Sequence, residues 1–305
     1  MLYFPELPNV PDSQLTDGHG YLRYDEICQD GRVQVLGLAH NVGLVVWRHL
    51  LSKHAVTRMS RNLGIVPILS RMIMCNTAET VSVGHPLTAH GGYSLAHTRG
   101  IDGEVNRLLM NIWVDMTGPR SRTHAPPPEG HGTIVPMGKV WAEHVFTRPF
   151  GPKHERKVLS FPDDQLADVP DDECHWRTPA EIMALPDGAT PIDAAIRTDP
   201  TPIVFGLNHT DSNQHVNSLQ YPRIFIEALL RRLAENDKPI AVLPNYIEIA
   251  YRKPCFAGTQ ARIAMQTFAL EGGGFGAVGS FIRPEDADAP ADARAYCYLR
   301  MTAVE

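Results

Sequence analysis

A run of hydrogen-bonding side chains at residues 211–221, DSNQHVNSLQY, is the part of the sequence best suited to chemistry. Asp211, Asn213 and His215 alternate along it, so in an extended segment all three would face one side. An aspartate can act as a general base or nucleophile, an asparagine can donate to a carbonyl oxygen or orient a water, and a histidine can share the proton. The spacing therefore predicts one catalytic site formed by Asp211, Asn213 and His215.

The apolar stretch that follows predicts a helix whose first turn faces this site. Residues 223–236, RIFIEALLRRLAEN, have apolar side chains at helical spacing, and Pro222 fits a first helical turn because it lacks an N–H. The free N–H groups and the positive dipole end of such a turn suit a developing oxyanion. Asn217 and Tyr221 flank the turn and are candidate catalytic or positioning residues, with capping and packing as their alternative roles.

Two blocks of similar pattern make up most of the chain. Each block has a helical stretch followed by several strand-like segments in succession, which is typical of antiparallel pairing and of the α+β class. The first block has a helix within 34–54 and strands within 64–74, 79–87, 92–101 and 105–116. The second has the helix at 223–236 and strands within 240–253, 259–270, 275–284 and 293–304.

The stretch between the blocks is rich in proline and acidic residues. We interpret residues 1–118 as an N-terminal repeat, 119–195 as a connection and 196–305 as a C-terminal repeat that carries the site. Within the connection, GKVWAEHVFTRPF is a possible extra strand and TPAEIMAL a possible short capped helix.

Composition limits the other classes of function. The chain has 305 residues, 43% of them apolar, which is typical of a globular protein with a core. A net charge of -6 without a basic cluster argues against nucleic acid and anionic membrane as partners. Five cysteines at irregular spacing indicate neither a disulfide framework nor a zinc site, and no apolar run reaches the ~18 residues of a membrane span. We expect a cytoplasmic protein without cofactor or metal.

The motif DSNQHVNSLQY resembles the D-x-N-x-H-V-N-N-x-x-Y signature of the fatty acyl-ACP thioesterases and their hot-dog relatives. TDPTPIVFGLNHTDSNQHVN and YIEIAYRKPC resemble that family's strands on either side of the helix, and YLRYDEICQDGRV with ILSRM resembles its N-terminal repeat. The resemblance implies a tandem (double) hot-dog fold, in which each repeat is an antiparallel sheet wrapped around a central helix. It also implies a thioester substrate carried on acyl carrier protein or coenzyme A.

The strand after the second helix departs from the family's pattern. Plant members have a glutamate followed by a cysteine there, whereas this chain reads YRKPCF, with Pro254 in the place of the glutamate. Cys255 is retained and is a candidate catalytic or positioning residue, with a buried structural thiol as the alternative. The nearest upstream acid, Glu248, lies six residues away, or ~20 Å along a strand, which is too far for direct substitution.

The first repeat lacks the signature. When Val33 is aligned with Val216, each directly before its helix, Cys28, Asp30 and Arg32 occupy the positions of the three site residues. The resemblance implies that this repeat helps to form the acyl pocket, and core packing is the alternative. The candidate lining residues are Leu38, Val42, Val45, Val46 and Trp47.

The prediction is a thioesterase that hydrolyses acyl thioesters, above all acyl-ACP, in fatty acid or polyketide metabolism. One alternative is a hot-dog dehydratase, cyclase or acyltransferase that modifies a tethered acyl group. Another is a non-catalytic acyl-binding protein. Either a monomer or a homodimer agrees with a double hot-dog fold, because the two repeats already supply internally the pairing that single repeats obtain by dimerising.

Overall fold

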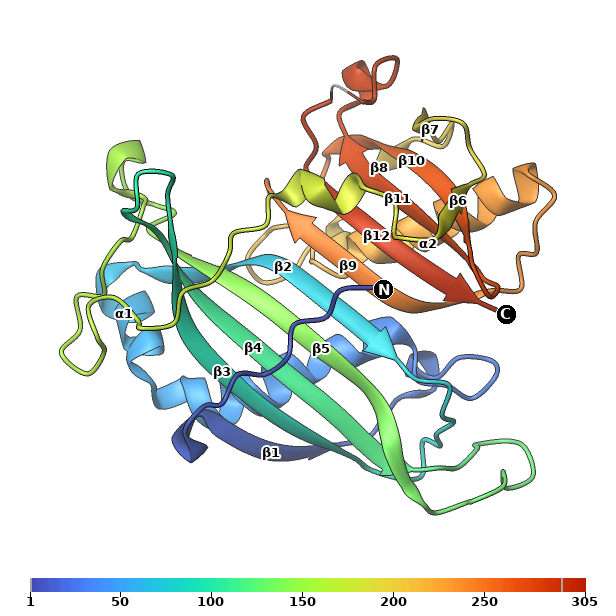
Figure 1. Ribbon diagram of the computed structural model, residues 1–305, viewed down its shortest axis with the longest axis horizontal. Helices are drawn as coiled ribbons and strands as arrows, with labels where there is room; N and C mark the ends of the chain where they lie inside the picture. The colour runs from blue at the N-terminus through green and yellow to red at the C-terminus, as the bar shows by residue number, and fades with distance from the viewer. Residues whose placement is uncertain (1, 292) are drawn as a thin grey trace. The chain divides into compact units, whose positions relative to one another are not determined.

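The computed structural model describes residues 2–291 and 293–305 and divides the chain into two compact units (Figure 1). The N-terminal unit is Phe4–Arg177, and the C-terminal unit is Thr178–Glu305, to which Leu2 and Tyr3 also belong. Among the described residues, no helix is both long and apolar enough to cross a membrane.

The N-terminal unit is an antiparallel sheet with a helical segment packed on it. Its strands lie in the order β1 (Leu15–Gly20), β3 (Leu87–Arg99), β4 (Val105–Pro119), β5 (Ile134–Thr147) and β2 (Val66–Asn76). The helical segment consists of the 3₁₀ turn η3 (Val35–Ala39) and the π-helix η4 (Val42–Leu50). The remaining helical elements are η1 (Asp12–Gln14), η2 (Tyr24–Glu26), η5 (Leu51–Lys53), α1 (Ala55–Leu63) and η6 (Lys153–Glu155).

Glycines in the sheet allow this helical segment to approach closely. A Cβ at Gly138 of β5 would lie 2.7 Å from the Leu38 side chain, and a Cβ at Gly91 of β3 would lie 2.7 Å from Val46. Both apolar side chains are fully buried in the resulting core. Any larger residue at these two sheet positions would therefore push the helix away.

The C-terminal unit repeats this arrangement with a regular helix. Its strands lie in the order β9 (Leu243–Tyr251), β12 (Cys297–Val304), β11 (Phe275–Ile282), β10 (Gln260–Leu270) and β6 (Ala189–Pro191), and β7 (Arg197–Thr198) and β8 (Ile203–Val204) also pair with β10. The helix α2 (Gln220–Glu235) lies along this sheet (Figure 1). Short 3₁₀ turns complete the unit at η7 (Pro179–Met183), η8 (Leu207–His209) and η9 (Pro284–Asp286).

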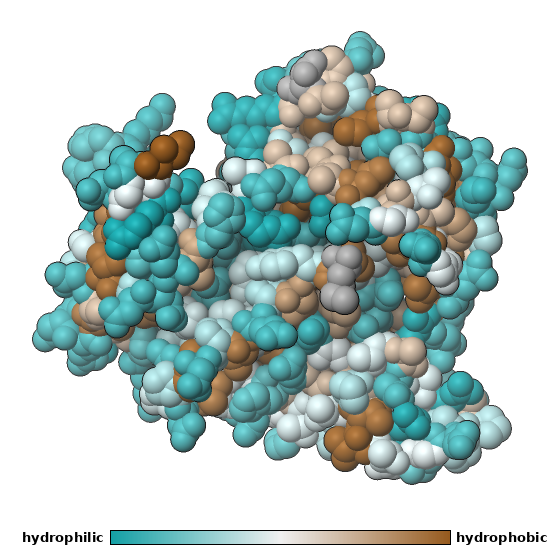
Figure 2. Space-filling model, in the orientation of Figure 1, coloured by the Kyte–Doolittle hydropathy of each residue, from teal (hydrophilic) through white to brown (hydrophobic). Residues whose placement is uncertain are grey.

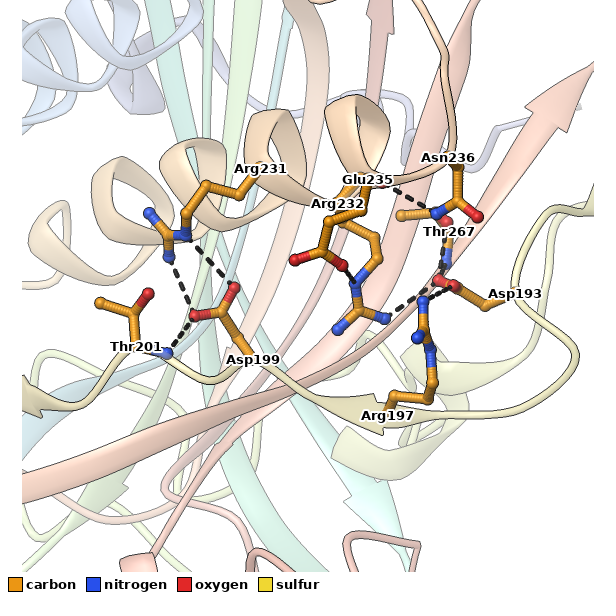
Figure 3. A network of polar contacts seen from close by, with 9 residues as sticks. All are labelled: Asp193, Arg197, Asp199, Thr201, Arg231, Arg232, Glu235, Asn236 and Thr267. Atoms are coloured by element: carbon orange, nitrogen blue, oxygen red, sulfur yellow. Dashed lines mark hydrogen bonds and ion pairs between the residues drawn. The ribbon is translucent and has the colours of Figure 1, made fainter.

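Apolar and polar contacts together hold α2 in place. Phe225 is fully buried, and a Cβ at Gly279 of β11 would lie 2.6 Å from its ring. Near the C-terminus of the helix, Arg232 pairs with Asp193, and the neighbouring Arg231 donates to the Asp199 carboxylate (Figure 3). The helix is therefore fixed by packing in its middle and by ion pairs near its C-terminus.

The structure confirms the α+β class and the pattern of an antiparallel sheet around a helix in each block. The predicted strand at 79–87 is wrong, because this stretch is irregular apart from a single bridge at Thr80 and the start of β3. The possible strand near residue 138 is β5, which pairs with β4 and β2 inside the first sheet. The N-terminal unit thus runs to residue 177, well beyond the boundary expected at 118.

Candidate active site

The residues that carry the motif form a tight turn and not an extended segment. The Asp211 N–H donates to the His215 carbonyl at 3.0 Å, and Gln214 has a φ of 62°. The Asp211 carboxylate accepts the Asn213 N–H at 2.9 Å, which is the local bond by which aspartate favours a turn. The predicted alternation of three side chains on one side is therefore wrong.

The Asp211 carboxylate is half-buried and held from two directions. Its Oδ1 accepts the backbone N–H of Asn213, and its Oδ2 accepts the side-chain amide of Asn217 at 3.4 Å. An ionised carboxylate offers about four lone-pair positions, so two remain for a water or a substrate group. Among the three motif side chains, this one has the environment of a positioned base.

Asn217 links that carboxylate to the start of α2. Its side-chain oxygen accepts the Leu219 N–H at 3.0 Å, and its carbonyl accepts the Gln220 N–H at 3.0 Å. Asn217 thus closes a turn before α2, whose N-cap residue, Leu219, has no side-chain cap hydrogen bond, and the amide of Asn217 also orients Asp211. Because the chain's own acceptors take these two N–H groups, the helix start offers fewer oxyanion donors than the sequence predicts.

The other two motif side chains point toward solvent. Asn213 is exposed, and no hydrogen bond from its side chain is found in the described part of the chain. The His215 ring is also exposed and lies edge-on to the Phe256 ring, with centroids 5.1 Å apart. No hydrogen bond joins either side chain to the Asp211 carboxylate among the described residues, so the turn brings the three together only through its backbone.

Tyr221 and Cys255 hold the turn in place through hydrogen bonds. The Cys255 N–H donates to the Tyr221 hydroxyl at 3.3 Å, and its carbonyl accepts the Val216 N–H at 2.8 Å. Burial raises the pKa of the Cys255 thiol, and its side chain is fully buried. A buried, protonated thiol is a poor nucleophile, so the geometry favours the positioning role for this residue. The sequence reasoning missed Tyr251, whose hydroxyl donates to the Ser218 carbonyl at 3.0 Å and fixes the same loop.

Glu248 does not take the place of the missing glutamate. Its buried carboxylate accepts hydrogen bonds from Arg300 and from the Tyr246 hydroxyl, each at 3.3 Å. Pro254 is exposed and lies in the irregular segment after β9, directly before Cys255. The distance argument made from the sequence therefore agrees with a structural role for Glu248.

The loop of the N-terminal unit that aligns with the motif contains Cys28, Asp30 and Arg32. Asp30 forms an ion pair with Arg32, and burial raises the pKa of the Cys28 thiol to about 11.

The five residues expected to line an acyl pocket lie on the helical segment. Four of them, Leu38, Val42, Val45 and Val46, are buried in the core. Their packing matches the alternative of core residues, and the pocket role remains a prediction.

Comparisons with known proteins bear on the fold. A search of protein-family models and a search of curated proteins each found no match. Among solved structures, an acyl-ACP thioesterase from Bacteroides thetaiotaomicron is 10% identical, with a TM-score of 0.57 over 96% of this chain and 98% of that one. A 12:0-ACP thioesterase from Umbellularia californica is 14% identical, with a TM-score of 0.55 over 95% of this chain and 94% of that one.

The chain has the double hot-dog fold of acyl-ACP thioesterases. Coverage of more than nine-tenths of both chains means that both hot-dog repeats, and the segment between them, have counterparts in these enzymes. At such low identity the likeness concerns the double hot-dog fold alone, and any activity has to be argued from the site.

Proposed function

We propose that the protein hydrolyses acyl thioesters, with Asp211 as the general base. The observation that carries this proposal is the Asp211 carboxylate itself, which is held by Asn213 and Asn217 in the turn before α2 and keeps lone pairs free for water. The double hot-dog fold supports it, because both solved structures named above are described as thioesterases.

Hydrolysis of a thioester requires a base that activates water and a donor that stabilises the oxyanion. Asp211 takes a proton from water as the water oxygen bonds to the thioester carbonyl carbon. We assign the exposed amide of Asn213 as the donor to the resulting oxyanion, with His215 as the second candidate. The carbon–sulfur bond then breaks, and the thiolate leaves and is protonated by solvent. The products are a free acid and a free thiol.

We expect the acyl group to arrive on an acyl carrier protein, with coenzyme A as the second carrier. This expectation rests on the names of the two similar structures and on the motif in DSNQHVNSLQY. We also expect a role in fatty acid or polyketide metabolism in the cytoplasm.

Pro254 favours a second candidate function. Plant members of the family that the motif resembles have a glutamate at this position, and Glu248, the nearest upstream acid, is bound to Arg300 instead. A site with one carboxylate could instead modify an acyl group that stays tethered, by elimination or transfer. In that case no thiol would be released, and the mass of the tethered group would change.

Thiol release from a panel of acyl-ACP and acyl-coenzyme A substrates tests the proposal. We expect the wild type to release thiol and Asp211→Asn to lose ~10²-fold or more in kcat/KM. Asp288→Ala, which removes an exposed aspartate elsewhere in the same unit, is the matched control and should match the wild type. If the folded wild type releases no thiol from any substrate, hydrolysis is excluded, and mass analysis of the acyl carrier then tests the second candidate.

A further inference from the structure

In the N-terminal unit, His54 lies at a break between two helical segments. The π-helix η4 and the short turn η5 end just before it, and α1 begins just after it. His54 has an extended conformation, with a φ of -73° and a ψ of 158°. Its N–H donates to the Leu51 carbonyl at 3.2 Å, and its carbonyl accepts the Thr57 N–H at 3.0 Å. This one residue therefore closes the first segment and opens the second.

The imidazole of His54 caps the N-terminus of α1. Its Nδ1 accepts the Val56 N–H at 3.3 Å, which satisfies one of the free N–H groups of the first turn. The residues most common at this position, Ser, Thr, Asp and Asn, accept through an oxygen. An imidazole accepts only through a nitrogen that carries no proton. The cap of α1 therefore requires His54 with Nδ1 unprotonated.

The other ring nitrogen fastens the same side chain to the sheet. His54 Nε2 lies 3.0 Å from the Tyr93 hydroxyl on β3, and the two rings are edge-on with centroids 5.3 Å apart. Because Nδ1 is an acceptor, the neutral ring carries its proton on Nε2 and donates it to the Tyr93 oxygen. Tyr93 is 4% exposed, and its hydroxyl also shares a hydrogen bond with the side chain of Gln14, directly before β1. The neutral ring thus connects α1, β3 and the segment before β1.

A second proton on the His54 ring is incompatible with this arrangement. It would bind Nδ1 and convert the acceptor into a donor that faces the Val56 N–H. Two donors without an acceptor between them repel each other, and the first turn of α1 loses its cap. The positive charge would also lie at the positive end of the helix dipole. Protonation therefore acts directly on the start of α1.

The charged groups around the ring come from two elements. Arg58, in the second turn of α1, opposes protonation of His54, and Asp163, in the loop after β5, favours it. These two residues pair with each other at 3.0 Å. Burial has the largest effect and, together with Arg58, lowers the pKa of His54 below its usual value. Burial raises the pKa of Tyr93, so this hydroxyl stays neutral while the histidine titrates.

Solvent can supply the proton directly. His54 is half-buried, and the side chain of Arg58 beside it is 40% exposed. Hydrophilic residues predominate on the face of the molecule drawn in Figure 2, and apolar residues lie in small groups between them. The loops and helix ends are therefore in contact with water, and a change in pH reaches the ring without a channel.

From this geometry we propose that His54 is a pH-sensitive switch at the break between η5 and α1. The neutral ring caps α1 and holds it to β3, whereas the protonated ring leaves the Val56 N–H and the first turn of α1 opens. Because the fold stabilises the neutral ring, its contribution is complete above the unfolded-state pKa of about 6.5 and is lost as the pH falls through the lower folded-state pKa. The switch does not involve Asp211 and is independent of thioester hydrolysis.

Hydrogen exchange at the Val56 amide of the full-length protein tests the switch. Protection factors, corrected for the intrinsic exchange rate at each pH, are compared at pH 7.5 and pH 4.5. We expect the protection of Val56 in the wild type to fall about 5-fold, the effect of losing an N-cap. His54→Asn keeps an acceptor for the cap but does not titrate, so its protection should change much less. His54→Ala should show low protection at both pH values.

A second measurement does not depend on a folded variant. In the wild type labelled with ¹⁵N-histidine, the His54 ring at pH 7.5 should carry its proton on Nε2, and its titration should share a midpoint with the shift of the Val56 amide. A proton on Nδ1 at pH 7.5, or a ring midpoint at or above pH 6.5, would overturn the proposal. An equal fall in Val56 protection in the wild type and in His54→Asn would also overturn it, because another group would then cause the change.

Discussion

Replacing Asp193 by asparagine should weaken the attachment of α2 to its sheet. The Asp193 carboxylate accepts the Thr267 N–H at 2.9 Å and the Thr267 hydroxyl at 2.7 Å on β10, and the Arg232 guanidinium at 3.2 Å on α2 (Figure 3). Arg232 is only 2% exposed, so Asp193→Asn leaves a buried cation with Glu235 alone, which is 46% exposed. We expect a loss of about 3 kcal/mol in the free energy of unfolding, the lower end for breaking a buried ion pair.

Asp199→Asn is the matched control for this change. Asp199 is equally buried but pairs with Arg231, which is 37% exposed and can return to water. We therefore expect a loss of about 1 kcal/mol, because a solvated partner carries little penalty. Tryptophan fluorescence would report on the N-terminal unit, because all four tryptophans lie there. Hydrogen exchange of α2 in urea is therefore the suitable measurement. Equal losses in the two variants would refute the reasoning from burial.

The ion pair of Asp193 and Arg232 leads to a prediction about pH. Burial raises the pKa of the Asp193 carboxyl, but hydrogen bonds from Thr267 and Arg197 and the charge of Arg232 outweigh it and leave the pKa lowered. Because the pKa of Asp193 is lower in the folded than in the unfolded state, the ionised carboxylate stabilises the folded protein above the unfolded-state pKa of about 3.9. This stabilisation is lost as the pH falls through the folded-state pKa. The difference in unfolding free energy between wild type and Asp193→Asn should therefore shrink below about pH 4.

Three further substitutions or reactions test the site and the fold. Asn217→Ala should lower kcat for thioester hydrolysis by about 10-fold with little change in KM, because it releases the Asp211 carboxylate; an unchanged kcat would exclude the positioning role. Cys255 should react with iodoacetamide far more slowly at pH 8 than a free thiol, since burial raises its pKa; rapid labelling of the folded protein, read by peptide mass, would contradict this. Gly274→Ala should cost about 2 kcal/mol, because φ is 91° and the new Cβ would lie 2.8 Å from the Ala303 carbonyl oxygen. Gly273→Ala is the control in the same thermal melt: it has the same backbone strain, with a φ of 101°, but open space around the new Cβ, so it should cost less.

The C-terminal unit was the easier of the two to predict from the sequence. Its four main strands, β9 to β12, are rich in apolar residues and separated by turn residues, and β10 and β11 meet at the glycines 272–274 as that pattern indicates. In the N-terminal unit, β5 follows a long proline-rich loop, so its pairing with β4 and β2 has no local signal. The strand expected at 79–87 shows the opposite failure, since Val81 and Val83 have strand propensity but no partner strand.

The position of the motif in the fold was predicted better than its shape, and its catalytic role stays a prediction. The motif placed Asp211 before a helix, and the structure agrees. It did not reveal that the Asp211 side chain would bond the Asn213 N–H and close the backbone into a turn, because an alternating pattern assumes an extended chain. In the N-terminal unit, the contact between His40 Nδ1 and Glu26 Oε1 at 2.6 Å had no sequence signal, since only the folded loop brings these two residues together.

Comparison of the two repeats explains why the motif cannot simply be moved from one to the other. A graft of the motif onto the first repeat would be Cys28→Asp with Asp30→Asn and Arg32→His. Cys28 is 91% buried, and burial already raises its pKa to about 11, so a carboxylate there would be desolvated and would lose the Arg32 cation. Asp211, by contrast, is half-buried and held by donors. We expect the graft to destabilise the N-terminal unit in tryptophan-monitored unfolding and to restore no thiol release to Asp211→Asn; recovered hydrolysis would show that the motif, and not its solvation, determines the activity.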